Sequence, residues 1–408
     1  MTSPRILIVG GGIGGLTTAI ALHRIGLRPR VVEQASAISV MGSGITIQAN
    51  AWAVYDALGI ELPDEDIVPI GAFEMLSEDR VVMSGDSADM SGRFPSVNIH
   101  RADLHAALVR HLEAAGGTLE LGRRAAAIRP RDEVVDVIFE DGETAEVDLL
   151  IGADGLNSTV RRLLYGSAGT RYSGQTCWRF AVAADNVPQL TVERWAPGRR
   201  VGLVPLSRGR VYGYLVESAP AGTPGDGTSA AAHVRARFKG LHAGLDPILD
   251  QLVEAEANGE AGLIHHGDLR DQPYITFGKG RVLLMGDAAH ATTPNLGQGA
   301  GMAIEDAASI AIGLGSGAVG CDGLETWLEG VRLDRVKHVQ KTSWRIGAMA
   351  HWQNGVARWF RDTMDEAAFA KVEATIEGRT PLAVASGPDD IADAALFFVS
   401  DAARHVTG

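Results

Sequence analysis

Three glycine-rich segments of this chain combine tight turns with a nearby carboxylate, which suits a ligand that carries phosphate and sugar hydroxyl groups. The first, G10-G-G-I-G-G15, lies between a strand-like run and a helical pattern, and Glu33 ends the next strand-like run. In such a GxGxxG turn Gly10 permits the bend, Gly12 lets a pyrophosphate approach the backbone, and Gly15 allows close packing of helix on strand. Glu33 would accept hydrogen bonds from a ribose hydroxyl. The segment therefore predicts a dinucleotide site, which could hold either FAD or NAD.

A second glycine turn, D148-L-L-I-G-A-D-G155, places Asp154 where a buried strand ends. Asp154 could face a ligand at the edge of the sheet, or it could cap the helix that follows. The sequence leaves both interpretations open at this point.

A third segment, R281-V-L-L-M-G-D-A-A-H290, is followed by Pro294 and by G297-Q-G-A-G301. The carboxylate of Asp287 can hold a ribityl or ribose hydroxyl at the end of this strand-like run. The glycine turn after it begins a helix, whose free N–H groups would stabilise the negative charge that a reduced flavin acquires. His290 could transfer a proton, but a histidine in such a turn more often has a structural role.

The elements that must position these turns predict an α/β fold. The chain opens as strand, turn, helix and strand over residues 5–33, whereas residues 178–217 show only strand-like alternation. Helical patterns return at 230–255 and dominate from about residue 324. We therefore predict a Rossmann-like nucleotide-binding domain built from discontinuous segments, an inserted, mainly β substrate domain and a helical C-terminal region. The predicted bounds are 1–75, 101–172 and 273–320 for the nucleotide-binding segments, 76–100 and 173–272 for the substrate domain, 321–377 for the helical region and 378–408 for a tail.

Composition excludes several other classes of protein. Acidic residues outnumber basic ones by 50 to 37, for a net charge of −13, and no basic run occurs, so we expect no nucleic-acid partner. The two cysteines, Cys177 and Cys321, lack CxxC spacing, so we expect neither a disulfide framework nor a cysteine-based metal site. No stretch has roughly 18 uninterrupted apolar residues, so we expect no membrane span. The cysteine usage fits a reduced, cytoplasmic protein.

The three motifs, in this order, make the chain similar to a known family. Together with H100-R-A-D-L104 and the loop G42-S-G-I-T-I-Q-A-N50, they resemble the FAD-dependent aromatic hydroxylases, single-component flavoprotein monooxygenases of the para-hydroxybenzoate hydroxylase type. The resemblance spans about residues 4–350. It implies bound FAD, NADPH or NADH as a transient electron donor, and a flavin C4a-hydroperoxide that transfers OH to a small aromatic or heteroaromatic substrate. The residues that it implies for the FAD site are Gly10, Gly12, Ile13, Gly14, Gly15, Glu33, Gln34, Gly44, Ile45, Arg101, Asp154, Gly286, Asp287, Pro294, Gly297, Gln298, Gly299 and Ala300.

The same resemblance implies a substrate site between the flavin and the strands of residues 174–217. Arg200 and Tyr212 occur where the related urate-type hydroxylases place an arginine and a tyrosine on the substrate. Those enzymes have an acid where this chain has Asn295, which argues against urate itself. We predict Arg200, Tyr212 and Asn295 as catalytic residues, and Thr46, Arg179 and Tyr214 as substrate-binding residues. Tyr212 and Tyr214 could instead alternate on a strand and pack against their neighbours.

Other functions also have to be weighed. The tail at 378–408 resembles the end of short-chain dehydrogenases, but no Tyr-xxx-Lys site accompanies it, so we predict no dehydrogenase activity from the tail. The chain could be a flavin-binding protein without turnover, or another flavin oxidoreductase such as a halogenase or dehydrogenase. The expected partners are a small aromatic substrate and O2, in a monomer or homodimer. The sequence leaves open the substrate, the position hydroxylated and the choice between NADPH and NADH.

Overall fold

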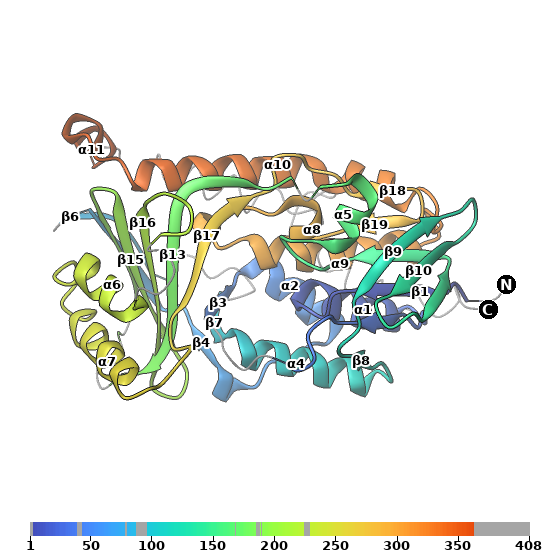
Figure 1. The fold of residues 1–408 in the computed structure, drawn as a ribbon, viewed down its shortest axis with the longest axis horizontal. Helices are drawn as coiled ribbons and strands as arrows, with labels where there is room; N and C mark the ends of the chain where they lie inside the picture. Colours follow the sequence, from blue (N-terminus) through green and yellow to red (C-terminus); the bar gives the residue numbers. More distant parts are fainter. Residues whose placement is uncertain are drawn as a thin grey trace.

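Two large sheets lie at opposite ends of the molecule (Figure 1). One has six strands and belongs to the nucleotide-binding domain; the other has seven strands. The computed structural model describes residues 3–38, 43–77, 80–86, 96–167, 169–184, 188, 190–223 and 229–362.

The six-stranded sheet is assembled from three separated parts of the chain. Its strands run in the order β18, β19, β12, β1, β2 and β8, and every neighbouring pair is parallel except β18 with β19. All residues of β1 are buried, which explains why this strand reads as a continuous apolar run and not as an alternation. The predicted assembly from discontinuous segments is confirmed. The strand bounds are β1 Ile6–Val9, β2 Arg30–Val32, β8 Leu119–Glu120, β12 Leu149–Gly152, β18 Gly278–Lys279 and β19 Val282–Leu284.

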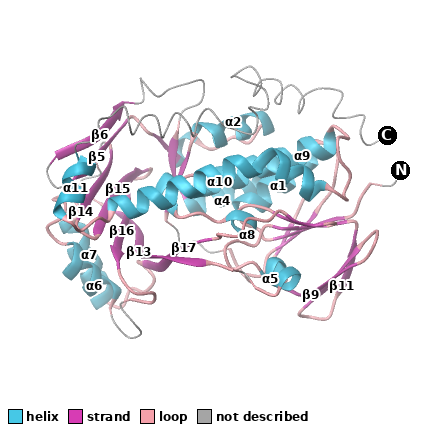
Figure 2. Ribbon diagram, turned by 90° about the horizontal axis from the view of Figure 1, so that it is seen from above, coloured by secondary structure: helices cyan, strands magenta, loops and turns pink. Residues whose placement is uncertain are grey.

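Helices pack against this sheet and begin at its glycine turns. α1 follows the first turn, α5 the second, and α8 and α9 the third. α1 packs along α9, and α9 packs along α10, which extends from this domain to the seven-stranded sheet (Figures 1 and 2). The helix bounds are α1 Ile13–Arg24, α2 Ala49–Leu58, α4 Arg101–Ala114, α5 Thr159–Tyr165, α8 Asp287–His290, α9 Gly299–Gly315, α10 Leu324–Ala350 and α11 Gly355–Asp362.

Two three-stranded antiparallel sheets complete the nucleotide-binding half. In one, β10 pairs with β9 and β11; in the other, β7 pairs with β3 and β4. The backbone N–H of Arg101 donates to the carbonyl of Ser43 at 2.9 Å, so the start of α4 lies beside the start of β3. The strand bounds are β3 Gly44–Ile47, β4 Ile67–Pro69, β7 Val97–His100, β9 Ala125–Pro130, β10 Val135–Phe139 and β11 Thr144–Val147.

The seven-stranded sheet is the predicted substrate domain. Its order is β17, β13, β16, β15, β14, β5 and β6, with only β14 and β5 parallel. Residues 72–86 supply its last two strands, β5 and β6. β7 belongs instead to the three-stranded sheet with β3 and β4. The bounds are β5 Ala72–Ser77, β6 Arg80–Asp86, β13 Arg171–Ala183, β14 Thr191–Ala196, β15 Arg199–Leu206, β16 Arg210–Ser218 and β17 His265–Asp271.

Side chains alternate between the two faces of this sheet. On one face Trp178, Phe180 and Val182 form a core with helices α6 (Ala230–Phe238) and α7 (Asp246–Ala257). The intervening residues of β13, including Arg179, therefore point to the other face. That face is the one that meets the nucleotide-binding domain and α10, where Gln175 donates to the Gly347 carbonyl at 2.8 Å.

Some predictions fall outside the described residues. These are the tail at 378–408, residues 363–377 of the helical region, and Gly42 of the flavin loop. Among the helices that the structure describes, none is long and apolar enough to cross a bilayer. In the same part of the chain, no three His, Cys, Asp or Glu residues are grouped to hold a metal ion.

Candidate active site

The first glycine turn connects the buried end of β1 to α1. A Cβ at Gly10, whose φ is +115°, would lie 2.4 Å from the Ala153 carbonyl oxygen, and a Cβ at Gly15 would lie 2.0 Å from the Gly10 oxygen. These two glycines are therefore required by the polypeptide itself. A Cβ at Gly12 would meet nothing within 4 Å. The space beside Gly12 is thus open for a ligand, as the pyrophosphate role requires.

The other residues predicted at this turn surround it. Ile13 is buried, and Gly14 packs against Ala303, where an added Cβ would lie 3.1 Å from the Ala303 side chain. The Glu33 carboxylate accepts hydrogen bonds from the backbone N–H of Gly11 and of Ala35, each at 2.9 Å. It is therefore fixed beside the glycine turn at the end of β2. Gln34 follows it on the surface, where it accepts a hydrogen bond from Arg124 at 3.0 Å.

Asp154 caps the helix that follows the second turn. Its carboxylate accepts hydrogen bonds from the Ser158 hydroxyl at 2.5 Å and from the N–H groups of Thr159 and Val160 at 2.6 and 3.0 Å. Burial raises the pKa of Asp154, and these hydrogen bonds oppose that rise. This geometry favours the capping interpretation, while a contact with the cofactor stays a prediction.

Asp287 presents an accessible carboxylate at the third turn. Gly286 has a φ of +54°. Asp287, which follows it, keeps exposed surface, but the protein atoms around its carboxylate desolvate it and raise its pKa. His290 and Arg101 oppose this rise in the pKa, which places both side chains near the carboxylate. Within the described residues, Asp287 makes no hydrogen bond or ion pair. A closely surrounded, accessible and unpaired carboxylate fits a ligand that carries hydroxyl groups.

Polar side chains from the β3–α2 connection hold the turn before α9. Gln48 donates to the Leu296 carbonyl at 2.9 Å and accepts a hydrogen bond from Gln298. Asn50 donates to Gln298 at 3.1 Å and to Glu305 at 2.6 Å. Gln298 is buried by these contacts. Pro294 and Gly297 are exposed, Gly297 has a φ of +65°, and Gly299 and Ala300 are half-buried at the start of α9.

The first turn of α9 can therefore stabilise a negatively charged group. No side chain caps the free N–H groups of this turn, and α9 is 17 residues long. Together with Gly12 and Asp287, this helix end gives three features that fit FAD: room for the pyrophosphate, an acceptor for sugar hydroxyls and a positive helix end for the flavin.

His290 is part of a buried charge network and does not face this space. Its Nε2 lies 2.7 Å from the Asp306 carboxylate, which also accepts hydrogen bonds from the Gly286 N–H at 2.9 Å and from Arg332 at 2.6 Å. Burial alone would raise the pKa of Asp306, but His290 and Arg332 bring it far below its usual value. The network ties α8, α9 and α10 together, so the structural interpretation of His290 is the one that the geometry supports.

Three of the predicted substrate residues, Arg179, Tyr212 and Tyr214, share the face of the seven-stranded sheet that lies opposite α6 and α7. Strand register pairs Arg179 with Tyr214, Tyr214 with Gly202, and Tyr212 with Val204. The rings of Tyr212 and Tyr214 lie 5.8 Å apart between centroids. The two tyrosines thus stand side by side on one face, as alternation predicts for residues two apart.

Tyr212 connects this face to the flavin loop. An added Cβ at Gly44 would lie 2.6 Å from the Tyr212 ring, so the absence of a side chain at Gly44 lets the ring approach β3. Arg179 lies close enough to Tyr212 for its positive charge to act on the Tyr212 hydroxyl. Burial raises the pKa of Tyr212 to about 12, against the lowering effect of Arg179. Tyr212 is therefore a neutral hydroxyl group between Arg179 and the cofactor side.

Arg200 forms a second cluster, with Glu193 and Asn295. It is 2% exposed, and it contacts Glu193 at 3.4 Å and donates to the Asn295 side-chain oxygen. Glu193 also accepts hydrogen bonds from Tyr214 and, at 2.6 Å, from Trp195. Burial and the Glu193 carboxylate raise the pKa of Tyr214 well above its usual value. Two of the three predicted catalytic residues, Arg200 and Asn295, thus touch each other.

Thr46 and Ile45 lie on β3 beside Gly44. Thr46 donates to Asn98 at 2.8 Å, and Asn98 in turn reaches Thr191 at 3.4 Å. Ile45 packs against the main core. Thr46 is therefore held on the side of β3 that joins the two domains.

Sequence reasoning missed two charged or titratable residues of this face. Glu193 lies two residues before Trp195, so the strand alternation of residues 191–196 placed it on the same face as that tryptophan. Its partners Arg200 and Tyr214 come from other strands, and no local signal links them to it. His265 was missed for the same reason, because only the register of β17 places it opposite Arg179.

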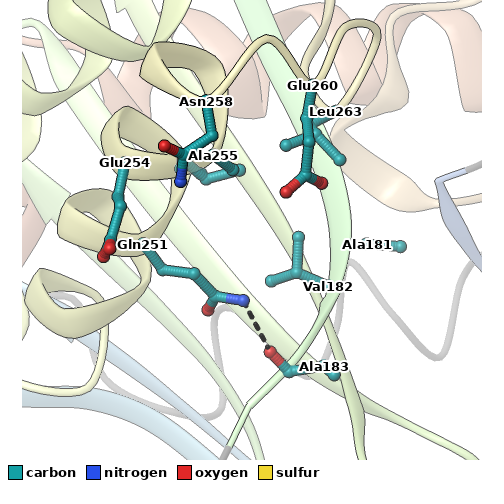
Figure 3. A pocket seen from close by; sticks show the side chains of 10 residues that line it. Ala181, Val182, Ala183, Gln251, Glu254, Ala255, Asn258, Glu260 and Leu263 are labelled. Atoms are coloured by element: carbon teal, nitrogen blue, oxygen red, sulfur yellow. Dashed lines mark hydrogen bonds between the residues drawn. The ribbon is translucent and has the colours of Figure 1, made fainter.

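A hollow elsewhere in the sheet domain is distinct from this face. It has a volume of about 410 Å³ and lies between the end of β13 and α7, where Gln251 donates to the Ala183 carbonyl at 3.3 Å (Figure 3). Val182, which lines it, belongs to the face that packs on α6 and α7. The hollow therefore lies away from Arg179 and Asp287.

Comparisons with known proteins agree with this geometry. The family model described as FAD binding domain matches residues 4–326. Aurachin C monooxygenase/isomerase of Stigmatella aurantiaca is 35% identical over 370 residues, covering 89% of this chain and 94% of that protein. The 2-heptyl-3-hydroxy-4(1H)-quinolone synthase of Pseudomonas aeruginosa is 31% identical, covering 88% of this chain and 93% of that protein. The 6-hydroxynicotinate 3-monooxygenase of Bordetella bronchiseptica is 31% identical, covering 75% and 82%.

Solved structures share the fold. Klebsiella pneumoniae HpxO complexed with FAD and uric acid superposes with a TM-score of 0.79 at 24% identity, covering 94% of this chain and 97% of that one. The resemblance predicted from the three motifs is confirmed by the family match and by these relatives. The chain therefore belongs to the FAD-binding-domain family and is an FAD-dependent aromatic monooxygenase.

Proposed function

We propose that this enzyme hydroxylates a heteroaromatic ring of the 4(1H)-quinolone class, with NADPH or NADH as electron donor and O2 as the oxygen source. One observation carries the substrate class: within the described residues, Arg179 makes no ion pair with a carboxylate, and its positive charge lies close enough to Tyr212 to oppose the rise of the Tyr212 pKa. An uncompensated guanidinium group suits a ring that carries an electron-rich or anionic oxygen. The quinolone synthase of Pseudomonas aeruginosa supports this ring system among the possible ones.

The residues on this face divide the work of binding. Arg179 and the Tyr212 hydroxyl would hold the ring oxygen, while Tyr214 and Thr46 would border the ring. The Glu193 carboxylate balances the positive charge of Arg200, and Asn295 accepts one of its hydrogen bonds, so Arg200 is less available to a substrate carboxylate. The Arg200 Nε, however, is buried and has no hydrogen-bond partner among the described residues, which leaves one donor for the substrate.

The cofactor would lie across the third turn. FAD would be held by the open turn at Gly12, by Arg101 and Asp287, and by the first turn of α9, and when bound it supplies electron transfer and oxygen activation. The protein supplies position and charge: the N–H groups at Gly299 and Ala300 stabilise negative charge, and the aromatic side chains on the sheet exclude water.

The experiment is a substrate panel with purified holoenzyme. We expect 2-heptyl-4(1H)-quinolone, the ring without the 3-hydroxyl, to stimulate NADPH or NADH oxidation and O2 uptake. The product should be heavier by one oxygen atom. The comparison rings are 6-hydroxynicotinate and 3-hydroxybenzoate, after the names of two relatives. Selective turnover of either one would contradict the quinolone proposal, and oxidation without oxygen insertion would favour a flavin dehydrogenase.

We also propose that the enzyme acts in the cytoplasm as a monomer or homodimer. The cysteine pattern supports a reducing compartment, because neither cysteine is paired: Cys177 is buried and Cys321 is half-buried. Light scattering of the holoenzyme tests the oligomeric state, and a mass of a tetramer would contradict it.

A further inference from the structure

Glu193 lies in a row of residues that crosses the face of the seven-stranded sheet on which Arg179 and Tyr214 stand. Strand register pairs Glu193 with Met75 of β5 and with Gly202 of β15. It also pairs Gly202 with Tyr214, and Tyr214 with Arg179. Because Gly202 has no side chain, the Tyr214 ring lies over it and donates its hydroxyl hydrogen to the Glu193 carboxylate. A carboxylate is thus fixed on the face that would receive an aromatic ring.

Three donors hold the Glu193 carboxylate in place. Its Oε1 accepts a hydrogen bond from Trp195 Nε1 at 2.6 Å and lies 3.4 Å from Arg200 Nη1, while its Oε2 accepts from Tyr214. The side chain of Arg200 is only 3% exposed, whereas that of Glu193 is 16% exposed. The more accessible member of this ion pair is therefore the acid and not the arginine.

The charge of Arg200 is balanced by Glu193. Within the described residues, no other carboxylate forms an ion pair with Arg200, and its second partner, Asn295, is uncharged. His351 also lies near Arg200, but burial lowers its pKa to about 3, so it adds no positive charge near pH 7. The pair of Arg200 and Glu193 is therefore neutral as a unit.

The two sides of this face consequently differ in charge. Arg179 makes no ion pair with a carboxylate within the described residues, so it attracts a negatively charged group. A negative group at Arg200 would meet the Glu193 carboxylate at close range, and the two charges would repel each other. A neutral group meets no such repulsion. It can also accept a hydrogen bond from Arg200 Nε, which has no partner among the described residues.

We propose that Glu193 is a specificity-determining residue, which makes the site select aromatic rings without a carboxylate substituent. This inference rests on the proposed function, because a 4(1H)-quinolone has a ring oxygen to face Arg179 and no carboxylate to face Arg200. Arg179 attracts the oxygen of the ring, and Glu193 rejects an anionic group at the other side. The acid thereby also fixes which edge of the ring faces each arginine.

Two rings of similar shape separate the effect of charge from that of size. 3-Hydroxybenzoate, chosen after the name of one relative, carries a carboxylate, and 3-hydroxybenzamide carries a neutral amide in its place. Holoenzyme with oxidised FAD is titrated with each ring, and the change in flavin absorbance reports binding. Glu193→Gln keeps an acceptor for Tyr214 but frees the charge of Arg200. We expect it to bind the benzoate at least about tenfold more tightly than the wild type does, and the amide within about threefold.

Glu217→Gln is the matched control, because Glu217 lies on the opposite face of the same sheet. Its carboxylate also forms an ion pair with an arginine, Arg237, at 2.7 Å, and it contacts His233 of α6. This variant should keep the wild-type affinity for both rings. The double variant Glu193→Gln with Arg200→Gln should lose the gain in benzoate binding, because the freed guanidinium group is absent.

Arg200→Gln alone keeps the test decisive if Glu193→Gln does not fold. It leaves the acid without its cation, so it should bind the benzoate at least about threefold more weakly than the wild type and the amide with unchanged affinity. Unchanged benzoate affinity in Glu193→Gln, an equal gain in Glu217→Gln, or a gain that persists in the double variant would overturn the role of Glu193. Selective turnover of 3-hydroxybenzoate by the wild type would contradict the quinolone proposal alone, since the affinities of the variants still decide the role of Glu193.

Discussion

Arg200 of β15 donates a hydrogen bond to the side-chain oxygen of Asn295, which joins the substrate sheet to the turn that precedes α9. The Asn295 amide nitrogen donates in turn to the Thr293 hydroxyl at 3.0 Å and to the Ser343 carbonyl at 2.7 Å. One side chain thus links the sheet, the turn and α10. A displacement of the seven-stranded sheet would therefore also move the turn before α9, because Asn295 connects the two.

Replacing Asn295 should therefore cost stability. Asn295→Ala removes the acceptor of a guanidinium that is 2% exposed, and we expect a loss of about 1–3 kcal/mol in the free energy of unfolding. Urea unfolding measures it. Asn295→Asp keeps an acceptor for Arg200 but loses both N–H donors. Its free energy of unfolding should therefore lie between those of the wild type and of Asn295→Ala. An unchanged midpoint for Asn295→Ala would contradict the role of this contact.

Gly12 and Gly10 should respond differently to the same substitution. Gly12→Ala adds a Cβ that meets no atom of the protein, so the apoprotein should keep its stability while FAD affinity falls at least about tenfold. Gly10→Ala adds strain at a positive φ and a contact of 2.4 Å, so it should destabilise the fold itself. Fluorescence titration with FAD and urea unfolding separate the two effects. Wild-type FAD affinity in Gly12→Ala would contradict the open-turn assignment.

Replacing Asp287 and replacing Asp154, the aspartates of two glycine turns, should affect different properties of the protein. Asp287 has no partner among the described residues, so Asp287→Ala should weaken FAD retention at least about tenfold with little change in unfolding. Asp154 accepts three hydrogen bonds at the start of α5, so Asp154→Ala should cost about 1–2 kcal/mol of stability. Flavin content after gel filtration and urea unfolding are measured on both. Loss of FAD in Asp154→Ala at wild-type stability would instead support its predicted cofactor contact.

The glycine motifs could be interpreted from sequence because their physics is local. Gly10 and Gly15 are constrained by backbone atoms a few residues away or on the next strand, and this constraint is common to strand-turn-helix units. The partnership of Arg200 with Glu193 and Asn295 depends on strand register and domain docking. Neither leaves a pattern within one segment, so the arginine was predicted and its acidic partner was not.

The role of Asp154 shows a different limit. Its position at the end of a buried strand fits a ligand contact and a helix cap equally well, because both use an acceptor at a helix N-terminus. Only the distances to Ser158, Thr159 and Val160 favour the cap. Sequence identified the right residue and could not decide what it binds.

Gly202 and Tyr214 should show coupled effects on stability. A Cβ at Gly202 would lie 1.9 Å from Cζ of the Tyr214 ring, so Gly202→Ala must displace the ring from Glu193. We expect a loss of about 1–3 kcal/mol, the range for overpacking of a well-packed site. In the double variant with Tyr214→Ala the clash is gone. The double variant should therefore lose less stability than the sum of the losses in the two single variants. Strict additivity in urea unfolding of the four proteins would contradict the contact.

His351 should make the fold sensitive to mild acid. It follows α10, is 6% exposed, and contacts the Ser218 hydroxyl through Nδ1 at 3.0 Å, while its Nε2 has no hydrogen-bond partner among the described residues. Burial, assisted by Arg200, lowers its pKa to about 3 from an ordinary 6.5. Between these values the unfolded chain binds the extra proton, so this residue's contribution to stability falls as the pH drops below 6.5.

The His351→Asn variant isolates that contribution. Asn keeps a polar contact for Ser218 but cannot titrate, so the difference in unfolding free energy between wild type and variant should itself change with pH. Lowering the pH from 7 to 5.5 should cost the wild type about 1 kcal/mol more than the variant, following the limit of about 1.4 kcal/mol per pH unit for one proton. Urea unfolding at the two pH values measures this difference. Equal losses in the two proteins would mean that His351 titrates normally in the folded state, and that its buried ring is reached by water.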